Sequence, residues 1–597
     1  MKMVHGGKKI VSTALAVATV SALVLTGCQT GSAKVTYGGA TASSTNYSKA
    51  KPITLEVFSQ TANYSGTQGG WFGKILKDKF KVTLKIISGQ GVGANLYTTR
   101  SAAGNLGDII IMGDLNKFND AVKAGLVADI TSLAPKYASY VTKNFPKAIS
   151  RMKTDFGKGK KIYGFPSEVA TEKATVSSDG PDLWFSNFML YSAYMKAGAP
   201  KINTMEDLLP VVQKMQKARP IADNGKKTYG FSLFKDWDGS LMTSAKQYAC
   251  IEGGWDEWGF NLVSPSGDKI QSLLDKNGQY YRNLKFYHNA SKMGLVDPDS
   301  YAQTESDWAT KLQNGQTLTC WWNLCEGQYN TEQHTAANWK NTSTGVTGPD
   351  GYVMVPIKDE KVRTDGFAPA GANYAMAVGS KNADKPRTVA LINWLYSPEG
   401  MECSFNGPKG VTWTTDKNGK NPRLTSLGKA AVNNPSTKMP TSAGGGTYQD
   451  GQDKLADFHC VNYNSKDPKT GEAYIYSAWK SYQSAPTALV KAWSKNIAGG
   501  ASNVHEYLNK NKQLGVVIGS QIHTPQLSTT QTTESNSIQS IVRQYSWKMA
   551  MTTSDSEFDS DWAALVSQAK QAGLADVDKT FQSQYKKLKA SRAAALK

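Results

Sequence analysis

The sequence predicts an α/β protein with doubly wound, mostly parallel sheets and extra helices at its C-terminus. Strand-length apolar segments alternate with a helical segment between residues 53 and 112, which is typical of βαβ units. Helical patterning dominates the last 60 or so residues. The chain has 597 residues, of which 40% are hydrophobic, 10% aromatic and 19% charged. This composition excludes disordered and collagen-like proteins and leaves room for several domains.

The N-terminal elements place a candidate site at one edge of a sheet. Strands are predicted at 53–58, 82–87 and 108–112, and a helix at 70–80. The third strand is apolar after Asp108, as expected of a strand buried on both faces. Because open sheets bind ligands beyond the carboxyl ends of their strands, residues 60–71 and 113–115 are expected near a site.

The later elements are predicted from periodicity and from turn residues. Helices are expected at 205–217, 283–293 and 386–396, strands at 316–322, 351–356 and 373–378, and polar loops at 431–454 and 524–537. Three further helices are expected at 538–551, 561–572 and 577–596.

The N-terminus has the pattern of a secretory signal peptide. Three lysines precede an uncharged stretch rich in Ala, Val and Leu at residues 10–26. Residues 1–27 are therefore predicted to be a signal peptide, and a retained membrane anchor is the alternative. Residues 28–51 are rich in Gly, Ser, Thr and Ala, which predicts a flexible tether before folding begins near Pro52.

The net charge of +20 raises the hypothesis of an anionic partner. The lysines are scattered and no nucleic-acid-binding motif accompanies them, so a solvated basic surface is favoured and no nucleic-acid partner is predicted. Attraction of anionic sugars such as uronates is a further interpretation that this charge permits.

Motifs for catalysis or for a resident metal are weak in this sequence. No H-E-x-x-H, G-x-S-x-G or P-loop pattern is present. A G-x-G-x-x-A pattern at 89–94 suggests a dinucleotide site, but Asp108 opens a strand where a ribose-binding acid should end one, so an ordinary loop is favoured. An acid pair for glycoside hydrolysis stays open. The nearest acidic cluster is Glu252, Asp256 and Glu257, for which a solvated helix edge is favoured.

The cysteines beyond position 28 match no zinc-site spacing. Buried thiols, or one or two disulfides, are both compatible with their positions, which are Cys250, Cys320, Cys325, Cys403 and Cys460.

Tryptophans near turn residues indicate a carbohydrate ligand. An indole face can stack on a pyranose ring while nearby Asp, Asn and Gln side chains bind its hydroxyls. The tryptophans concerned are Trp184, Trp237, Trp255, Trp258, Trp321, Trp322 and Trp413. Most are expected in the core, with at least one in contact with a ligand.

Two further sets of residues carry a family resemblance. Leu25-Thr26-Gly27-Cys28 resembles the lipobox of bacterial lipoproteins, in which the cysteine becomes the acylated N-terminus. The order of Ala103-Gly104-Asn105-Leu106-Gly107-Asp108, Tyr163-Gly164-Phe165-Pro166, the run from Tyr374 through Ser397-Pro398-Glu399-Gly400, and Gly407-Pro408-Lys409-Gly410-Val411-Thr412-Trp413 resembles the ABC-transporter extracellular solute-binding lipoproteins, in particular their large oligosaccharide-binding subgroup.

The resemblance implies a two-lobed, periplasmic-binding-protein-like fold of type II with hinge crossovers near 164 and 372. Lobe 1 would comprise 52–163 and about 373–450, and lobe 2 would comprise 164–372 and about 451–597. The family implies a lipid-anchored monomer on the extracellular face of the bacterial cell membrane, without catalysis. It would pass an oligosaccharide to the permease subunits of an ABC importer.

The expected lining residues combine the resemblance with the aromatic pattern. They are Trp71, Asp114, Trp184, Trp237, Trp322, Asn323, Tyr374 and Trp413. No cofactor is predicted. Some members of the family hold calcium in an acidic loop, but the matching segment at 222–228 is shorter and basic, so calcium is doubtful. A secreted glycoside hydrolase or lyase, and a wall-binding or adhesion protein, are the competing hypotheses.

Overall fold

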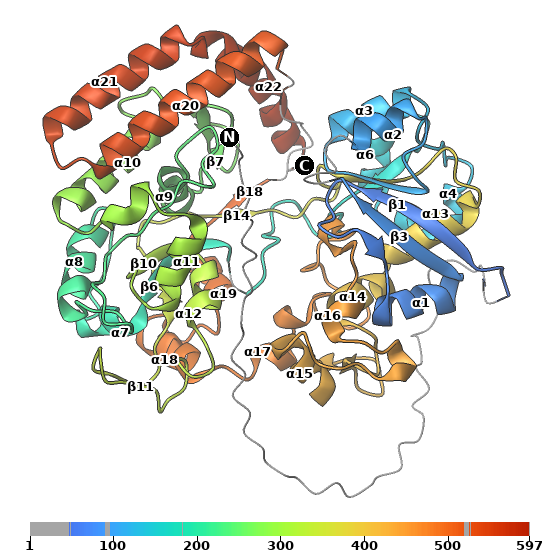
Figure 1. Cartoon of the computed structure of the whole chain (residues 1–597), viewed down its shortest axis with the longest axis horizontal. Coiled ribbons are helices and arrows are strands. Elements are labelled where there is room, and N and C mark those ends of the chain that lie inside the picture. Colours follow the sequence, from blue (N-terminus) through green and yellow to red (C-terminus); the bar gives the residue numbers. More distant parts are fainter. Residues whose placement is uncertain are drawn as a thin grey trace, which may run out of the picture.

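The computed structural model describes residues 47, 49–89, 96–181, 183–518, 525 and 527–595. Within this part the chain folds into two lobes that lie side by side, joined by crossing strands (Figure 1). The predicted signal peptide, Cys28, most of the tether and most of the 89–94 motif lie outside the described residues. Across the described helices, none combines the length and apolar character that a bilayer span requires.

Lobe 1 is built on a six-stranded sheet whose strand order is β2-β3-β1-β4-β15-β5. The parallel strands are β1 (Ile53–Ser59), β3 (Val82–Ser88) and β4 (Ile109–Met112). Two strands from later in the chain, β15 (Ala375–Val378) and β5 (Gly164–Pro166), complete the sheet in antiparallel pairing beside β4, and β2 (Gly66–Thr67) pairs with β3.

The apolar run of β4 is explained by cores on both faces of this sheet. Ile109 and Ile111 pack into one core, whereas Ile110 and Met112 pack into the other, because successive side chains of a strand point to opposite faces. Helices α1 (Gly70–Phe80) and α13 (Lys385–Leu395) cover the first face. Helices α3 (Leu115–Lys123) and α6 (Pro146–Phe156) cover the second.

Lobe 2 has an antiparallel sheet rather than the parallel one expected. Its strand order is β10-β6-β13, with β6 (Phe185–Leu190) between β10 (Thr319–Trp322) and β13 (Tyr352–Met354). The helices that pack on it include α8 (Leu208–Ala218), α9 (Thr243–Gly253), α10 (Gln279–Lys292), α11 (Glu305–Gln313), α12 (Leu324–Tyr329), α18 (Ala488–Asn496) and α19 (Val504–Lys510).

Three long helices complete lobe 2, two along its top in this view and the third running toward lobe 1 (Figure 1). They are α20 (Thr529–Met551), α21 (Asp555–Gln571) and α22 (Leu574–Ala595), and their apolar side chains belong to the lobe 2 core. The extra C-terminal helices are therefore confirmed. The start of α20 differs from the prediction, because residues 529–537 were expected to be a loop.

Within the described residues, the chain passes between the lobes three times. It leaves the lobe 1 core after Val169, returns to it by Ala375, and finally leaves it after Tyr474. The segments meet at the hinge, where Val169 pairs with both Ala368 and Val461. A parallel ribbon of β14 (Val362–Asp365) and β18 (Leu514–Val517) lies beside them.

The final passage of the chain from lobe 1 to lobe 2 occurs later in the sequence than predicted. Residues from about 451 were assigned to lobe 2, yet Leu455, Phe458 and Tyr474 pack in the lobe 1 core. The first lobe 2 core residue after them is Leu489. The segment 451–483 is therefore part of lobe 1, and a subset of its polar and aromatic side chains, including Tyr463 and Tyr482, lines a cavity shared with the other lobe.

Candidate functional site

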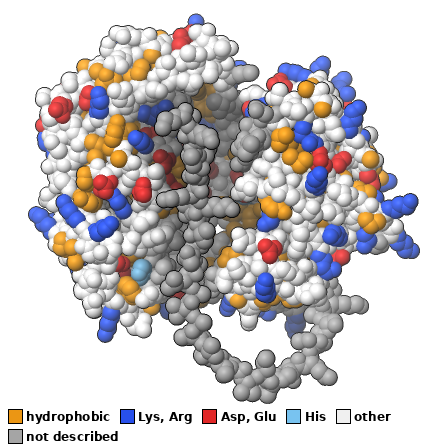
Figure 2. All heavy atoms as spheres, viewed as in Figure 1, with side chains coloured by type: hydrophobic (Ala, Val, Ile, Leu, Met, Phe, Trp, Pro, Cys, Tyr) orange, Lys and Arg blue, Asp and Glu red, His pale blue; other side chains and the backbone are white. Residues whose placement is uncertain are grey.

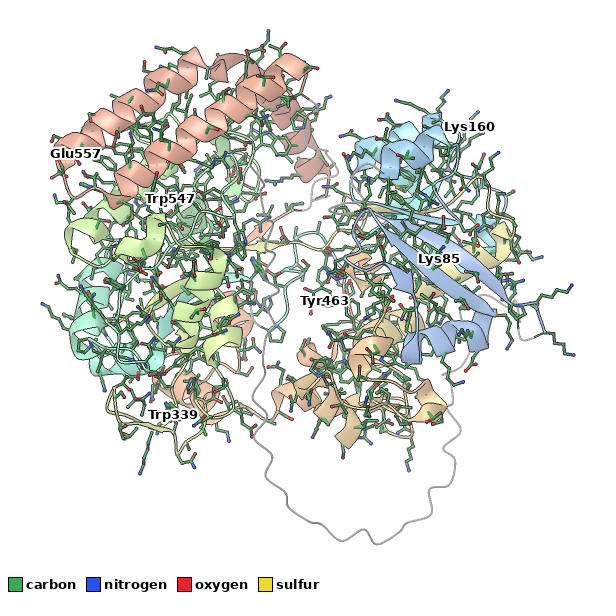
Figure 3. The ribbon with its side chains drawn as sticks, viewed as in Figure 1. Lys85, Lys160, Trp339, Tyr463, Trp547 and Glu557 are labelled. Atoms are coloured by element: carbon green, nitrogen blue, oxygen red, sulfur yellow. The ribbon has the colours of Figure 1, made fainter. Side chains whose placement is uncertain are left out.

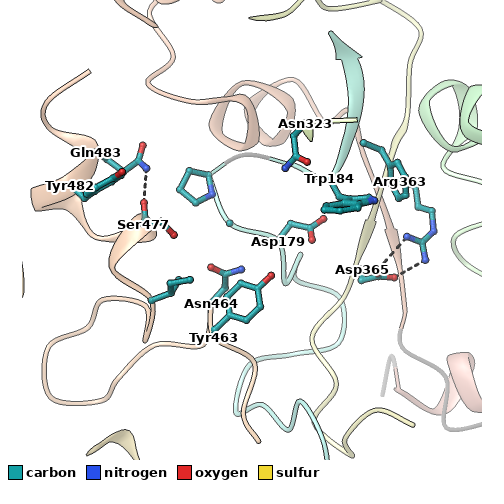
Figure 4. A pocket seen from close by; sticks show the side chains of 14 residues that line it. Asp179, Trp184, Asn323, Arg363, Asp365, Tyr463, Asn464, Ser477, Tyr482 and Gln483 are labelled. Carbon is teal, nitrogen blue, oxygen red and sulfur yellow. Dashed lines mark hydrogen bonds and ion pairs between the residues drawn. The ribbon is translucent and has the colours of Figure 1, made fainter. Parts of the chain in front are cut away.

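A cavity of about 670 Å³ lies between the two lobes. Lobe 2 and the crossing strands contribute Asp179, Gly180, Pro181, Trp184, Phe185, Asn323, Arg363 and Asp365, and lobe 1 contributes Tyr463, Asn464, Ile475, Ser477, Tyr482 and Gln483 (Figure 4). A site lined from both lobes can bind a ligand more tightly when the lobes close around it.

The lobe 2 wall is formed by residues next to paired strands. Trp184 immediately precedes β6 and its side chain is 46% exposed, with its ring edge-on to Phe185 at 6.4 Å. Asn323 follows β10, and its backbone N–H donates to the Trp184 carbonyl oxygen at 3.2 Å. The pairing of β10 with β6 thus brings together two of the predicted residues.

The lobe 1 wall comes from the segment that the sequence assigned to the other lobe. Tyr463 lies on the face of lobe 1 that looks toward lobe 2 (Figure 3). Asn464 donates from Nδ2 to the Ser178 carbonyl oxygen at 2.9 Å, which ties this wall to the crossing strand. Tyr482 is 44% exposed and stands edge-on to Tyr476 at 5.3 Å. Half-exposed rings on both walls give a ligand two apolar faces.

Several charged side chains surround Asp179 at the cleft. Arg363 donates from Nη2 to Asp365 at 2.8 Å, and its Nε lies 3.3 Å from Asp256. The Thr364 hydroxyl donates to Asp179. Desolvation by the surrounding protein, reinforced by the nearby Asp365 carboxylate, raises the pKa of Asp179 to about 6.

A smaller cavity of about 410 Å³ adjoins this region on the hinge side. It shares Asp179, Asp365 and Tyr463 with the larger one. The residues that it adds include Glu168, Ser178, Asp256, His459, Asn462 and Arg592. Among these, the His459 Nδ1 atom lies 3.3 Å from a Glu168 carboxylate oxygen.

Two of the predicted lining residues are buried in lobe 1, which corrects their assignment. Trp71 is fully buried, stacks on Tyr448 at 5.7 Å and donates from Nε1 to the Tyr448 carbonyl oxygen. Trp413 is 1% exposed and packs against Trp479. Neither indole has a free face to offer a sugar, because packing inside the protein covers both.

Trp322 and Trp237 form an aromatic cluster in lobe 2. Trp322 is 5% exposed and contacts Trp308 and Phe234, so it also belongs to the core. Trp237 stands edge-on to Trp322 at 5.7 Å and is 41% exposed. Trp237 does not line the interlobe cavity in its described part.

The remaining two predictions lie on lobe 1, apart from the described cavity lining. Asp114 follows β4, as expected, but its Oδ1 caps α3 by accepting from the Asn116 N–H at 2.8 Å. Tyr374 is 40% exposed just before β15, and its carbonyl oxygen accepts from the Ser167 N–H at 3.0 Å.

The basic loop at 222–228 does not fit a calcium ion. One Asp223 oxygen accepts from the Arg219 guanidinium at 2.7 Å and the other accepts from the Tyr329 hydroxyl at 2.7 Å. A guanidinium therefore occupies the place beside Asp223 that a cation would need. Elsewhere in the described residues, no group of three or more His, Cys, Asp or Glu side chains could hold a metal ion.

The five cysteines of the described chain are buried and unpaired. Of the two interpretations left open by their positions, the structure therefore has buried thiols. The acidic cluster is not a simple solvated edge, because each member forms an ion pair. Glu252 pairs with Arg282, Asp256 with Arg363, and Glu257 with Lys246.

Comparison with known proteins identifies both fold and family. The model of the bacterial extracellular solute-binding protein family matches residues 63–402, more than half of the chain. A comparison with curated proteins finds no match.

Solved structures share the fold over almost their whole length. An HMO-binding, ABC-transporter-associated solute-binding protein from Bifidobacterium longum infantis superposes with a TM-score of 0.56 at 17% identity, covering 90% of this chain and 99% of its own. The Streptococcus pneumoniae ABC-transporter substrate-binding protein FusA, in complex with kestose, superposes with a TM-score of 0.54 at 14% identity, covering 90% of this chain and 100% of its own. The alginate-binding protein AlgQ2 without calcium ion superposes with a TM-score of 0.53 at 15% identity, covering 91% of this chain and 100% of its own.

These structures confirm the predicted two-lobed α/β fold. With the family model matching more than half of its length, the chain belongs to the bacterial extracellular solute-binding proteins, and it is a binding protein rather than an enzyme.

Proposed function

We propose that the protein captures an oligosaccharide outside a bacterial cell and delivers it to the permease of an ABC importer. Acylation of Cys28 would hold it at the extracellular face of the cell membrane, since acyl chains on one residue anchor a protein by burying their methylenes. The protein acts as a monomer, and its two lobes close around the sugar.

The observation that carries this proposal is the pair of half-exposed aromatic walls across the cleft. Trp184 on lobe 2 and Tyr482 on lobe 1 are each more than 40% exposed and line one cavity. Aromatic faces stack on the C–H faces of sugars, and the amide side chains of Asn323, Asn464 and Gln483 lie beside them to bind hydroxyls. A volume of about 670 Å³ has room for several sugar units.

The names of the similar structures support the choice of ligand class. The proteins compared above bind HMO, kestose and alginate, according to their descriptions. All three ligands are glycans of more than one unit, and each of the three structures covers 90% or 91% of this chain. A large cleft of the same architecture supports an oligosaccharide over a monosaccharide.

Replacing Trp184 by alanine tests the proposal directly. W184A removes the stacking face, so affinity for a bound glycan should fall up to about tenfold, given the free energy of an aromatic contact. Titration by intrinsic fluorescence, with native mass spectrometry for stoichiometry, measures this loss. The protein should retain one intact glycan per chain.

The matched control is Y301A. Tyr301 is 50% exposed on lobe 2 and lines neither cavity of the cleft. Its removal should leave affinity unchanged. Equal affinities for W184A and the parent protein would remove Trp184 from the site, and release of shortened glycans would favour a carbohydrate-active enzyme.

A further inference from the structure

The charges that line the cleft are opposite in sign to those of the whole protein. Four carboxylates border the two adjoining cavities, on Glu168, Asp179, Asp256 and Asp365. Two arginines face them, and no lysine is among the described residues that line either cavity. The sequence as a whole has 68 Lys and Arg against 48 Asp and Glu.

Both arginines are already engaged by the protein. The Arg363 guanidinium lies between Asp365 at 2.8 Å and Asp256 at 3.3 Å. Arg592 is 3% exposed, and its Nη1 donates to the Ser264 carbonyl oxygen at 3.1 Å. The structure thus offers no free guanidinium with which a ligand carboxylate could form the usual bidentate pair, among the residues described at the cleft.

The carboxylates retain capacity to accept hydrogen bonds. Asp365 is exposed, with its side chain 58% accessible, and Asp179 points into the space beside Trp184 and Asn323 (Figure 4). Ionised carboxylates accept hydrogen bonds and donate none, so they suit sugar hydroxyls. They repel a second carboxylate, and the partial burial of Asp179 strengthens that repulsion because water screens it poorly.

The lysines lie elsewhere. Lys and Arg side chains are spread over the outer faces of both lobes in view (Figure 2). Lys85 lies on β3, on the face of lobe 1 in view, and Lys160 lies at the top of that lobe (Figure 3), and both are exposed. Charges on these faces contribute little to the electrostatic potential inside the cleft, because solvent and salt screen exposed charges within about 10 Å.

We infer that the cleft selects glycans without carboxylate or sulfate groups and excludes uronate-containing ones. This inference rests on the proposed function, because it names the ligand class of the same site. It assigns the positive charge of the chain to the outer surface and not to ligand recognition.

The test compares two pools of oligosaccharides of three to six units on the purified full chain. One pool contains neutral glucose, galactose, fructose and N-acetylglucosamine oligomers, and the other contains oligouronates of the same lengths from alginate and pectin. Native mass spectrometry identifies the bound species. Fluorescence titration gives the selectivity ratio, which is the dissociation constant for oligouronates divided by the dissociation constant for neutral glycans. Neutral glycans should bind at least about tenfold more tightly, with the ratio narrowing as salt is raised.

Two variants of opposite sign check that the cleft charge sets this ratio. D179N removes a carboxylate and should narrow the ratio, whereas Gln483→Glu adds one to the lobe 1 wall and should widen it. The ratio is the readout, since both substitutions also change contacts to neutral ligands.

The outcomes separate the two proposals. Oligouronates binding as tightly as neutral glycans, or a ratio unmoved by both variants, would overturn the charge selection and leave oligosaccharide capture intact. Binding of neither pool would overturn oligosaccharide capture and this inference with it.

Discussion

Glu360 is a buried carboxyl with consequences for stability. Its side chain is 1% exposed just before β14, and burial raises its pKa to about 8 from an ordinary value of 4.5. The protonated form is the one that suits the folded state. The stability gained from proton binding is therefore complete below about pH 4.5 and is lost as the pH rises through 8.

Replacing Glu360 by glutamine should stabilise the protein at neutral and alkaline pH. E360Q removes the cost of ionising a buried group, on the order of 3 kcal/mol at pH 7. Urea unfolding at pH 5 and pH 8 measures the effect, which should be larger at pH 8. E332Q, at an exposed glutamate, is the control and should change little at either pH. A pH-independent difference for E360Q would contradict the assignment.

Single residues also show what sequence reasoning could and could not reach. Trp184 is near Gly, Asp and Asn in the sequence and is half-exposed in the structure, because turns lie at the surface. The same signal failed for Trp413, whose ring turns inward on Trp479. Tyr463 and Tyr482 also lie in turn-rich segments, but sequence alone does not single them out, because tyrosine occurs both in cores and at surfaces.

At the scale of elements, the first part of α20 illustrates a helix start that periodicity cannot detect. Residues 529–537 are polar on every side, so no apolar stripe marks them. A capping box begins the helix, in which the Ser528 side chain accepts from the Gln531 N–H and the Gln531 side chain accepts from the Ser528 N–H. That Ser-x-x-Gln spacing is visible in the sequence and could have placed the helix start.

The attachment of α22 to lobe 2 can be tested through Phe581. Its ring stands edge-on to Trp258 at 6.0 Å, and its carbonyl oxygen accepts from Trp258 Nε1 at 3.0 Å. F581A should destabilise lobe 2 by about 3 kcal/mol through the lost buried ring. Hydrogen exchange should then become faster along α22.

Y585F provides the matched comparison on the same helix. It removes only the hydroxyl that donates to the Gly267 carbonyl oxygen at 2.9 Å, which should cost about 1 kcal/mol. Equal exchange in α22 for F581A and Y585F would show that Phe581 does not anchor the helix.

For the whole molecule, the hinge is the feature on which the proposed closure depends. Glu168 and His459 are adjacent hinge residues with φ of 49° and 45°, in the left-handed region that glycine favours. The Glu168 N–H donates to the His459 carbonyl oxygen at 2.6 Å. Such backbone strain is found where a chain must bend or bind.

Ligand binding should make the molecule more compact. Small-angle X-ray scattering of the protein with a bound oligosaccharide should give a smaller radius of gyration than without it, because the lobes close on the sugar. W184A at the same sugar concentration should scatter like the free protein. Identical scattering with and without a ligand proven to be bound would exclude closure.

The two-lobed arrangement was predicted from the order of family-like motifs, whereas the charge of the cleft was not. Net charge sums over the whole chain and carries no information on where each charge lies. The last hinge crossing was also misplaced, because residues 451–483 have neither a strong strand nor a strong helix pattern that would assign them to a sheet.

The position of β15 in the lobe 1 sheet has a consequence for biosynthesis. β4 lies between β1 and β15, and β15 follows it by some 260 residues, which a ribosome adds in about 13 to 50 s. Through that interval the apolar β4 has one unpaired edge, a template for aggregation. Lobe 1 therefore cannot finish folding until the ribosome has made the whole segment of lobe 2 that lies between β4 and β15.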